Sequence, residues 1–260
     1  MYSKRYKSNT LRGKLRVCRY LSADKSTSGM VPYTVKFTES NLKRMTEKYS
    51  TLYMKPDIGS LGIGVYKLNR TSNGFQLHRI SGKKQISKTF KTLSGLFHHV
   101  KSLEKNKRMI IQKAIRLDRV EGRPYDIRMM IQRKPGGAWR CTGFMVKVGS
   151  RHKIVTNYYQ GGKIYTIHKL LKKKGFSKES SAARIESLTR KGITVANVLS
   201  RKRSGMREMG IDFAYDGDNA LWILEVNSNH PQFHPIKKLD RESYNRMMEY
   251  ARSYGRYNAK

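Results

Sequence analysis

The sequence predicts an α+β fold with antiparallel sheets, because two hairpin signatures stand among helical segments. The first signature is residues 52–68, LYMKPDIGSLGIGVYKL, and the second is residues 210–229, GIDFAYDGDNALWILEVNSN. In each, a cluster of turn-forming residues separates two apolar runs, which is the pattern of paired strands. At 260 residues the chain is long enough to bury a large core in one or two closely packed lobes.

The first 108 residues are predicted to contain a leading region and the smaller lobe. Residues 1–50 read as a basic N-terminal arm with a short strand and a helix over residues 39–49. Residues 51–108 contain the first hairpin and two further elements. These elements are a strand near residues 75–80 and a helix over residues 93–106.

Residues 109–260 are predicted to form the larger lobe, which contains the second hairpin and ends in a helix. Apolar and polar residues alternate over several of its short segments, as is typical of antiparallel strands. Two longer stretches, residues 177–203 and 242–254, read as helices, although Gly192 is an unfavourable residue inside the first.

The first hairpin combines a cation with a glycine-rich turn, which suits a phosphate group. Three glycines within six residues let backbone N–H groups approach an anion closely, and Lys55 adds a mobile positive charge. The loop is not a Walker A loop, because a strand follows it and no Gly-Lys-Ser/Thr ends it. We predict a flap that closes over a nucleotide. Its contacting residues would be Lys55, Gly59, Ser60, Gly62 and Gly64.

The second hairpin carries oxygen ligands suited to a hard cation. Residues two apart on a strand face the same way, so Glu225 and Asn227 share one face. Antiparallel pairing can bring Asp212 close to them. Two carboxylates and an amide oxygen suit Mg²⁺, which takes its other ligands from water and phosphate. The alternative interpretation is a solvated hairpin edge.

The segment between the hairpins offers further contacts for a nucleotide. Residues 109–115 form a short apolar strand suited to presenting backbone N–H and C=O groups to an adenine edge. Asn157, ahead of a Gly161-Gly162 turn, is either a phosphate or metal contact or a turn residue. The candidate adenine contacts are Gln112, Lys113 and Ile115.

Asp126 and Arg128 form a second charged pair on one face of a predicted strand. The Arg128 guanidinium suits bidentate binding of a γ-phosphate or an acyl-phosphate oxygen. Asp126 would accept hydrogen bonds from ribose hydroxyls or would orient Arg128. The alternative is an ordinary surface ion pair, which contributes ~0–1 kcal/mol.

The order of these motifs resembles the ATP-grasp superfamily over residues 50–232, approximately. It is most similar to the YheC/YheD-type, spore-coat-associated ATP-grasp proteins. Residues 31–34, VPYT, and the Met54-Lys55-Pro56 lead into the glycine loop carry the closer resemblance, as does the RPYDIR run at 123–128. The resemblance implies an ATP-grasp fold with ATP held between two lobes. The folded domain that precedes this region in most relatives would be reduced or absent.

The resemblance also implies an activity and a role for each motif. The expected reaction is ATP- and Mg²⁺-dependent joining of a carboxylate to an amine through an acyl-phosphate. Lys55 would contact the α- and β-phosphates, and Arg128 would steady the transferred phosphoryl group. Mg²⁺ would be held by Asp212, Glu225 and Asn227. The alternatives are a kinase that uses the same site, or a non-catalytic spore-layer protein that binds ATP or polyanions.

Two departures from the family pattern concern the edges of the site. Many relatives follow Glu-x-Asn with a small residue and Pro-Gly, whereas here Ser228-Asn229-His230 follows, which affects the acceptor side. We consider His230 a candidate for touching the substrate. Relatives also carry an earlier lysine over the nucleotide, and both Lys14 and Lys25 are candidates for this position.

The net charge of +37, from 55 Lys and Arg against 18 Asp and Glu, exceeds what an ATP site requires. Such a charge attracts polyanions and speeds their encounter. An acidic peptide or protein substrate fits the ligase chemistry, nucleic acid is an alternative partner, and improved solubility alone would be a third explanation. No apolar run approaches the ~20 residues that cross a bilayer, so we expect no membrane partner. Two cysteines are too few for a disulfide framework, so we expect a reducing, cytoplasmic location, and the resemblance implies association with the spore.

Overall fold

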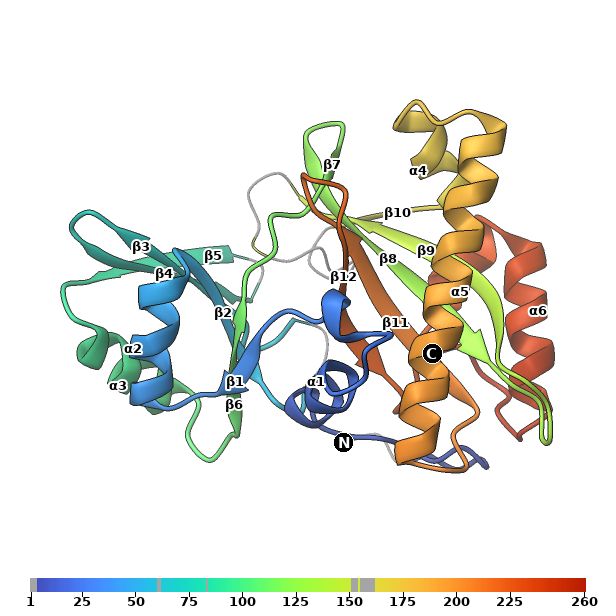
Figure 1. Cartoon of the computed structure of the whole chain (residues 1–260), viewed down its shortest axis with the longest axis horizontal. Helices are drawn as coiled ribbons and strands as arrows, with labels where there is room; N and C mark the ends of the chain where they lie inside the picture. The colour runs from blue at the N-terminus through green and yellow to red at the C-terminus, as the bar shows by residue number, and fades with distance from the viewer. Residues whose placement is uncertain (1–3, 60–61, 83, 151–153, 155–161) are drawn as a thin grey trace.

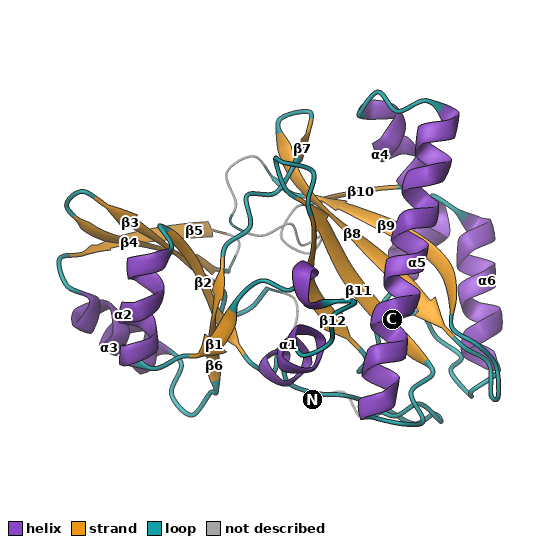
Figure 2. Ribbon diagram, viewed as in Figure 1, coloured by secondary structure: helices purple, strands orange, loops and turns teal. Residues whose placement is uncertain are grey.

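The computed structural model describes residues 4–59, 62–82, 84–150, 154 and 162–260. Two antiparallel sheets stand side by side, each covered by helices, and the N-terminal helix α1 (Lys14–Ser22) lies near the junction between them (Figure 1). Figure 2 shows the same division, with separate helices packed against each sheet. The α+β, two-lobed architecture predicted from the sequence is therefore confirmed.

The first sheet has the strand order β1-β6-β2-β3-β4-β5. Helices α2 and α3 cover one of its faces, where Leu42, Leu52, Leu68 and Leu96 are buried together. Its elements are β1 (Thr34–Lys36), α2 (Glu39–Lys48), β2 (Thr51–Pro56), β3 (Tyr66–Thr71), β4 (Gly74–Ser81), β5 (Lys84–Phe90), α3 (Leu93–Leu103) and β6 (Met109–Lys113).

The second sheet has the order β10-β9-β8-β11-β12, and β7 pairs with β8. Its strands are β7 (Arg119–Val120), β8 (Arg123–Gln132), β9 (Arg140–Val148), β10 (Lys163–Tyr165), β11 (Glu208–Tyr215) and β12 (Leu221–Asn227). Its helices are α4 (Ile167–Lys173), α5 (Lys178–Lys202) and α6 (Arg241–Arg252), and single 3₁₀ turns lie at η1 (Ser28–Met30) and η3 (His234–Lys238).

The two long helices of this lobe lie on opposite faces of the second sheet. Alternation along β8 sends Ile127, Met129 and Ile131 into the core under α5, whereas Met130 packs against Met247 of α6. Helix α6 covers only one end of its face. The other end of that face lies opposite the first sheet.

Two expectations about the chain order change in the structure. The sequence placed residues 109–113 in the larger lobe, but they form β6 of the first sheet, between β1 and β2. The leading region is also more ordered than a basic arm, because it contains α1, which packs against α5, β1 and β12. Among the described residues, no helix combines the length and apolar character that crossing a membrane requires.

Gly192 occurs inside α5 because the helix passes close to β8. A Cβ at this position would lie 2.2 Å from Sδ of Met129, which is fully buried. We expect Gly192→Ala to lower the free energy of unfolding by ~1–3 kcal/mol through overpacking, despite the better helix propensity of alanine. Urea unfolding measures this change, and a more stable variant would contradict the packing argument.

Candidate active site

A cleft of about 1300 Å³ opens between the two sheets. The first sheet contributes side chains from β2, β3 and β6, and the second contributes side chains from β8, β9, β11 and β12. The cleft lies on the part of this face of the second sheet that α6 leaves uncovered, and connecting segments complete its walls. Of the predicted site residues, those lining it are Lys14, Lys55, Gly59, Gly62, Gln112, Lys113, Ile115, Asp126, Arg128, Asp212, Glu225 and Asn227.

Arg128 and Asp212 form a buried bidentate pair on the floor of the cleft. They are register partners on β8 and β11, with Nε–Oδ1 and Nη2–Oδ2 distances of 2.5 and 2.8 Å. Gly210 leaves room for this arrangement, since a Cβ there would lie 3.0 Å from Cδ of Arg128. Asp126 and Arg128 do share one strand face, as predicted, and the structure adds Asp212 as the partner of the guanidinium.

Lys147 of β9 is a cation that the sequence analysis missed. Its Nζ lies 2.8 Å from Oδ1 of Asp126 and 3.1 Å from Oδ2 of Asp212. Burial would by itself lower the pKa of Lys147, but the two carboxylates outweigh it and raise the pKa. Burial would likewise raise the pKa of Asp212, but Arg128 and Lys147 hold it well below its usual range. Lys147 and Asp212 therefore stabilise each other in their charged forms.

Lys55 projects from β2 into the same cleft. Its Nζ donates to Oε1 of Gln112 at 2.8 Å and lies 3.5 Å from the carbonyl oxygen of Leu224. Burial lowers the pKa of Lys55, although the charge of Glu225 opposes the shift. Gln112 is held in turn, because its Nε2 donates to Oγ1 of Thr34 at 2.9 Å. Lys55 is thus fixed in position by one strand neighbour and faces the second sheet.

Lys14 reaches the cleft from the first turn of α1. Asp57 fixes that turn by accepting from the backbone N–H of Leu15 at 2.8 Å. The Nζ of Lys14 lies 3.0 Å from the carbonyl oxygen of Gly59 and 3.2 Å from Oε1 of Glu225. Lys25, the other candidate from the sequence, is exposed in the turn after α1 and does not line the cleft.

The glycine-rich connection joins β2 to β3 as an antiparallel hairpin, as predicted. Gly62 adopts a φ of 73°, and Ile63 beside it is 64% exposed. Gly64 is required for another reason than a phosphate contact: its φ is 71°, and a Cβ there would lie 2.9 Å from Cγ of Pro56. Gly64 is not among the cleft-lining residues. Ser60 and Asn157 lie outside the described residues.

The predicted adenine strand keeps two of its backbone donors occupied. The N–H groups of Lys113 and Ala114 donate to the carbonyl oxygens of Tyr33 and Thr51. The Lys113 ammonium lies 5.0 Å from the ring centroid of Trp222, on β12 of the opposite sheet. Ile115, which follows, lines the cleft where the chain leaves the first sheet.

The predicted magnesium ligands lie on neighbouring strands. Asp212 and Glu225 are directly opposite each other on β11 and β12, and Asn227 is two residues further along β12. Within the part of the chain that the structure describes, no cluster of three His, Cys, Asp or Glu side chains forms a metal site. Two carboxylates and one amide oxygen beside a phosphate would still suit Mg²⁺, which often binds through one or two carboxylates.

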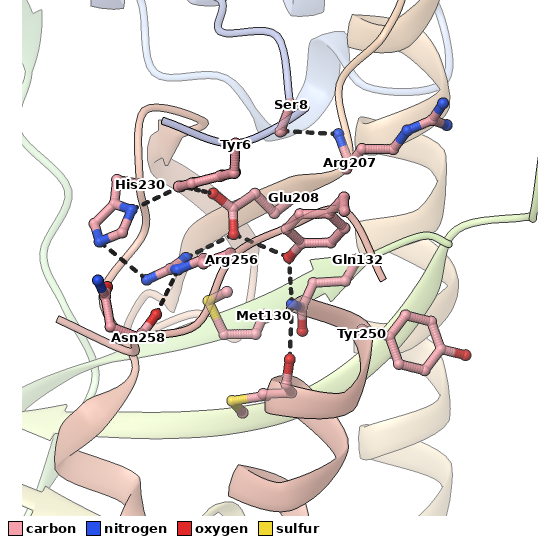
Figure 3. Close-up of polar contacts among 12 residues, drawn as sticks. Tyr6, Ser8, Met130, Gln132, Arg207, Glu208, His230, Tyr250, Arg256 and Asn258 are labelled. Atoms are coloured by element: carbon pink, nitrogen blue, oxygen red, sulfur yellow. Dashed lines mark hydrogen bonds and ion pairs between the residues drawn. The ribbon is translucent and has the colours of Figure 1, made fainter. Parts of the chain in front are cut away.

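Residues 228–232, which follow β12, also line the cleft, and we call them the acceptor loop. His230 lies in this loop but its ring is engaged. Its Nδ1 is 2.7 Å from the Tyr6 hydroxyl (Figure 3), and its Nε2 contacts the carbonyl oxygen of Lys260. Burial lowers the pKa of His230, as does the nearby charge of Arg256. His230 thus lines the cleft wall with both ring nitrogens engaged, and its contact with a substrate stays a prediction.

Two facing antiparallel sheets with a cation-lined cleft between them define an ATP-grasp fold. The chain belongs to the YheC/D-like ATP-grasp family, whose model matches residues 4–254. It is 26% identical over 257 residues to the endospore coat-associated protein YheD of Bacillus subtilis (strain 168), covering 94% of this chain and 54% of YheD. It is 22% identical over 199 residues to YheC of the same strain, covering 76% and 54%. The chain thus spans about half the length of these curated relatives.

Solved structures share the fold at low sequence identity. The ATP-grasp ligase PsnB, complexed with a phosphomimetic variant of a minimal precursor, Mg and ADP, superposes with a TM-score of 0.52 at 12% identity, covering 93% of this chain and 58% of PsnB. The N5-carboxyaminoimidazole synthetase of Staphylococcus aureus, complexed with ADP, gives 0.51 at 11% identity, covering 84% and 44%. These likenesses concern the fold alone.

Proposed function

We propose that the chain is an ATP- and Mg²⁺-dependent carboxylate–amine ligase that forms an amide bond through an acyl-phosphate. One observation carries the proposal: a single cleft joins the cations Lys14, Lys55 and Arg128 to the carboxylates Asp212 and Glu225. The cations suit a polyphosphate, and the carboxylates suit the metal that accompanies it. The family and the two ligase neighbours support the same class of reaction.

The reaction needs positioning and charge stabilisation rather than a covalent nucleophile. A substrate carboxylate oxygen attacks the γ-phosphorus, and the bond from that phosphorus to the oxygen of departing ADP breaks. An amine nitrogen then attacks the acyl carbon, phosphate leaves, and the amine loses a proton. Lys55 and Lys14 would hold the phosphates of ATP, while Arg128 and Lys147 would face the phosphoryl oxygens. Because their partners fix these cations, little reorganisation would accompany the transfer.

Bound Mg²⁺ would offset negative charge on the phosphoryl oxygens, with Asp212, Glu225 and Asn227 as its ligands. In the structure these carboxylates face cations instead, Asp212 toward Arg128 and Lys147 and Glu225 toward Lys14. The metal would therefore enter a site whose carboxylates already have cationic partners. Adenine would face the carbonyl groups of β6 and the Ile115 segment, since the amides of Lys113 and Ala114 are occupied.

The charge distribution supports an acidic peptide or protein as substrate. Residues 58–103, which run from the glycine loop through α3, contain no Asp or Glu and eight Lys or Arg. The acceptor end of the cleft is lined by Arg12, the acceptor loop, Asn258 and Lys260, with no carboxylate side chain among them. A glutamate- or aspartate-rich chain would be attracted to such a surface. Its biological setting would be the spore layer, where the names of the relatives place them.

The deciding experiment measures phosphate release from ATP and Mg²⁺ across single amino acids and acidic polypeptides, with mass spectrometry of each reaction. Stimulated release together with a mass gain equal to an amide condensation would establish the ligase and identify both substrates. A phosphorylated product would instead indicate a kinase. ATP binding without stimulated turnover would favour a non-catalytic protein of the spore layer.

Lys55→Ala tests the phosphate contact directly. Loss of one charge-assisted hydrogen bond, at ~1.5–3 kcal/mol, predicts ATP binding weaker by about 10–100-fold. Isothermal titration calorimetry measures this affinity, and Lys25→Ala, which changes an exposed lysine of the same type, is the matched control. Equal ATP affinity in the Lys55 variant and the control would remove Lys55 from the nucleotide site.

A further inference from the structure

Residues 4–13, to which we now restrict the name N-terminal arm, are hydrogen-bonded to the acceptor loop. The Nζ of Lys4 donates to the carbonyl oxygen of Ser228 at 2.6 Å. The Oγ of Ser228 accepts from the backbone N–H of Leu11 at 2.9 Å and lies 3.2 Å from the carbonyl oxygen of the same residue. One step further, Thr10 Oγ1 lies 3.4 Å from Oδ1 of Asn229. Segments more than 200 residues apart in sequence are thus joined through the backbone of the loop.

A hydroxyl from the arm fixes the next residue of the loop. The Tyr6 hydroxyl lies 2.5 Å from Oε1 of Glu208 and 2.7 Å from Nδ1 of His230 (Figure 3). The phenol therefore bridges the Glu208 carboxylate and the His230 ring. Tyr6 thus fixes the orientation of the His230 ring.

The loop needs this support because of its backbone. His230 has a φ of 74°, in the left-handed region that residues other than glycine rarely adopt. Such a conformation persists only where the surroundings over-determine it. The sequence places a histidine here, so contacts from outside the loop must hold the turn.

The arm is itself anchored on the second sheet. Glu208, the first residue of β11, is fully buried, and its carboxylate accepts from Arg256 at 2.6 Å and from the Tyr254 hydroxyl at 3.0 Å. Lys4 lies 3.4 Å from the same carboxylate. The buried carboxylate of Glu208 on β11 thus bonds both to the arm and to the segment that follows α6. Tyr6 links the acceptor loop to this carboxylate.

We propose that the N-terminal arm is a positioning element of the active site, which acts through Tyr6 and Lys4 to hold the acceptor loop in its working shape. The loop follows directly after Asn227, so its shape sets where an acceptor amine meets the activated carboxylate. The role in placing an acceptor amine rests on the proposed ligase function. The coupling between the arm and the loop does not depend on that function.

Two tyrosines that share Glu208 provide a matched test. Tyr6→Phe and Tyr254→Phe each remove one hydroxyl from the same carboxylate, but only Tyr6 also contacts His230. We expect amide hydrogen exchange of Asn229, His230 and Gln232 to accelerate about 10-fold in Tyr6→Phe, which corresponds to about 1.4 kcal/mol. Exchange at these amides should stay unchanged in Tyr254→Phe. The Nδ1 resonance of His230 should shift in the first variant only.

Mg·ADP affinity, measured on both full-length variants, should stay within twofold of the parent, since neither tyrosine lines the cleft. If Tyr6→Phe fails to fold, Lys4→Met removes the bond to Ser228 and should accelerate the same amides. Equal acceleration in both tyrosine variants, or none in either, would overturn the positioning role. Failure of the amide-bond assay alone would count against the ligase and leave the exchange result intact.

Discussion

Glu225→Gln is expected to reduce Mg²⁺-dependent ATP turnover by at least ~10²-fold while the fold is retained. The substitution keeps the shape of the side chain but removes the charge that a magnesium ion would meet opposite Asp212. The cost in stability should be below ~1 kcal/mol, because Glu225 is 32% exposed and Lys14 is its ion-pair partner at 3.2 Å. Phosphate release at varied Mg²⁺ concentration measures the effect.

The control for this substitution is Glu186→Gln, which removes the same charge from an exposed i,i+4 pair on α5. Its turnover should match the parent protein. Calorimetric titration of Mg²⁺ in the presence of ADP separates loss of metal binding from loss of nucleotide binding. Unchanged turnover in Glu225→Gln would remove the carboxylate from the metal site.

The largest expected effect on stability comes from Arg256→Met. Arg256 and Glu208 are both fully shielded from solvent, and their charged atoms are 2.6 Å apart. Removing the guanidinium leaves the carboxylate buried with only Lys4, at 3.4 Å, as a cationic neighbour among its described ion pairs. Breaking a buried pair in this way costs about 3–5 kcal/mol. Urea unfolding of the two proteins measures the difference.

Arg201→Met is the matched control, since Arg201 pairs with Asp24 at 2.9 Å but its side chain is 64% exposed. It should change the free energy of unfolding by less than ~1 kcal/mol. The double variant Glu208→Gln, Arg256→Met should recover part of the loss, because it removes the isolated charge. A similar decrease in the free energy of unfolding in Arg256→Met and Arg201→Met would show that the buried pair stabilises the fold no more than the exposed pair does.

The site residues that could be predicted from the sequence are those whose positions depend on neighbouring residues in the chain. Turn residues and alternation place Lys55 before the glycine loop, and they bring Asp212 close to Glu225 across a hairpin. Strand periodicity also places Asp126 and Arg128 on one face. These inferences need only residues that are close in sequence, which is why they agree with the strands and hairpins of the structure.

The parts that sequence reasoning missed depend on pairing between distant segments. Lys147 is one lysine among fifty-five Lys and Arg, and only the alignment of β9 with β8 and β11 brings it to Asp212. Lys14 could not be chosen over Lys25 because Asp57 positions the start of α1. Gly64 and Gly62 look equivalent in the sequence of the loop. The structure shows that Gly64 is needed for its close packing against Pro56. A lysine on an otherwise apolar strand, such as FMVKV, is the signal that would have found Lys147.

The chain passes between the two sheets at one place, where Thr34 and Gln112 are direct partners on β1 and β6. Partners across such a ladder have Cα atoms about 5 Å apart. Residues 34–113 are therefore an insertion whose two ends nearly touch, carried by a continuous host formed by the flanking segments. A single short joint would restore the host chain, so this topology allows the lobe that contains the first sheet to be gained, lost or exchanged as one unit.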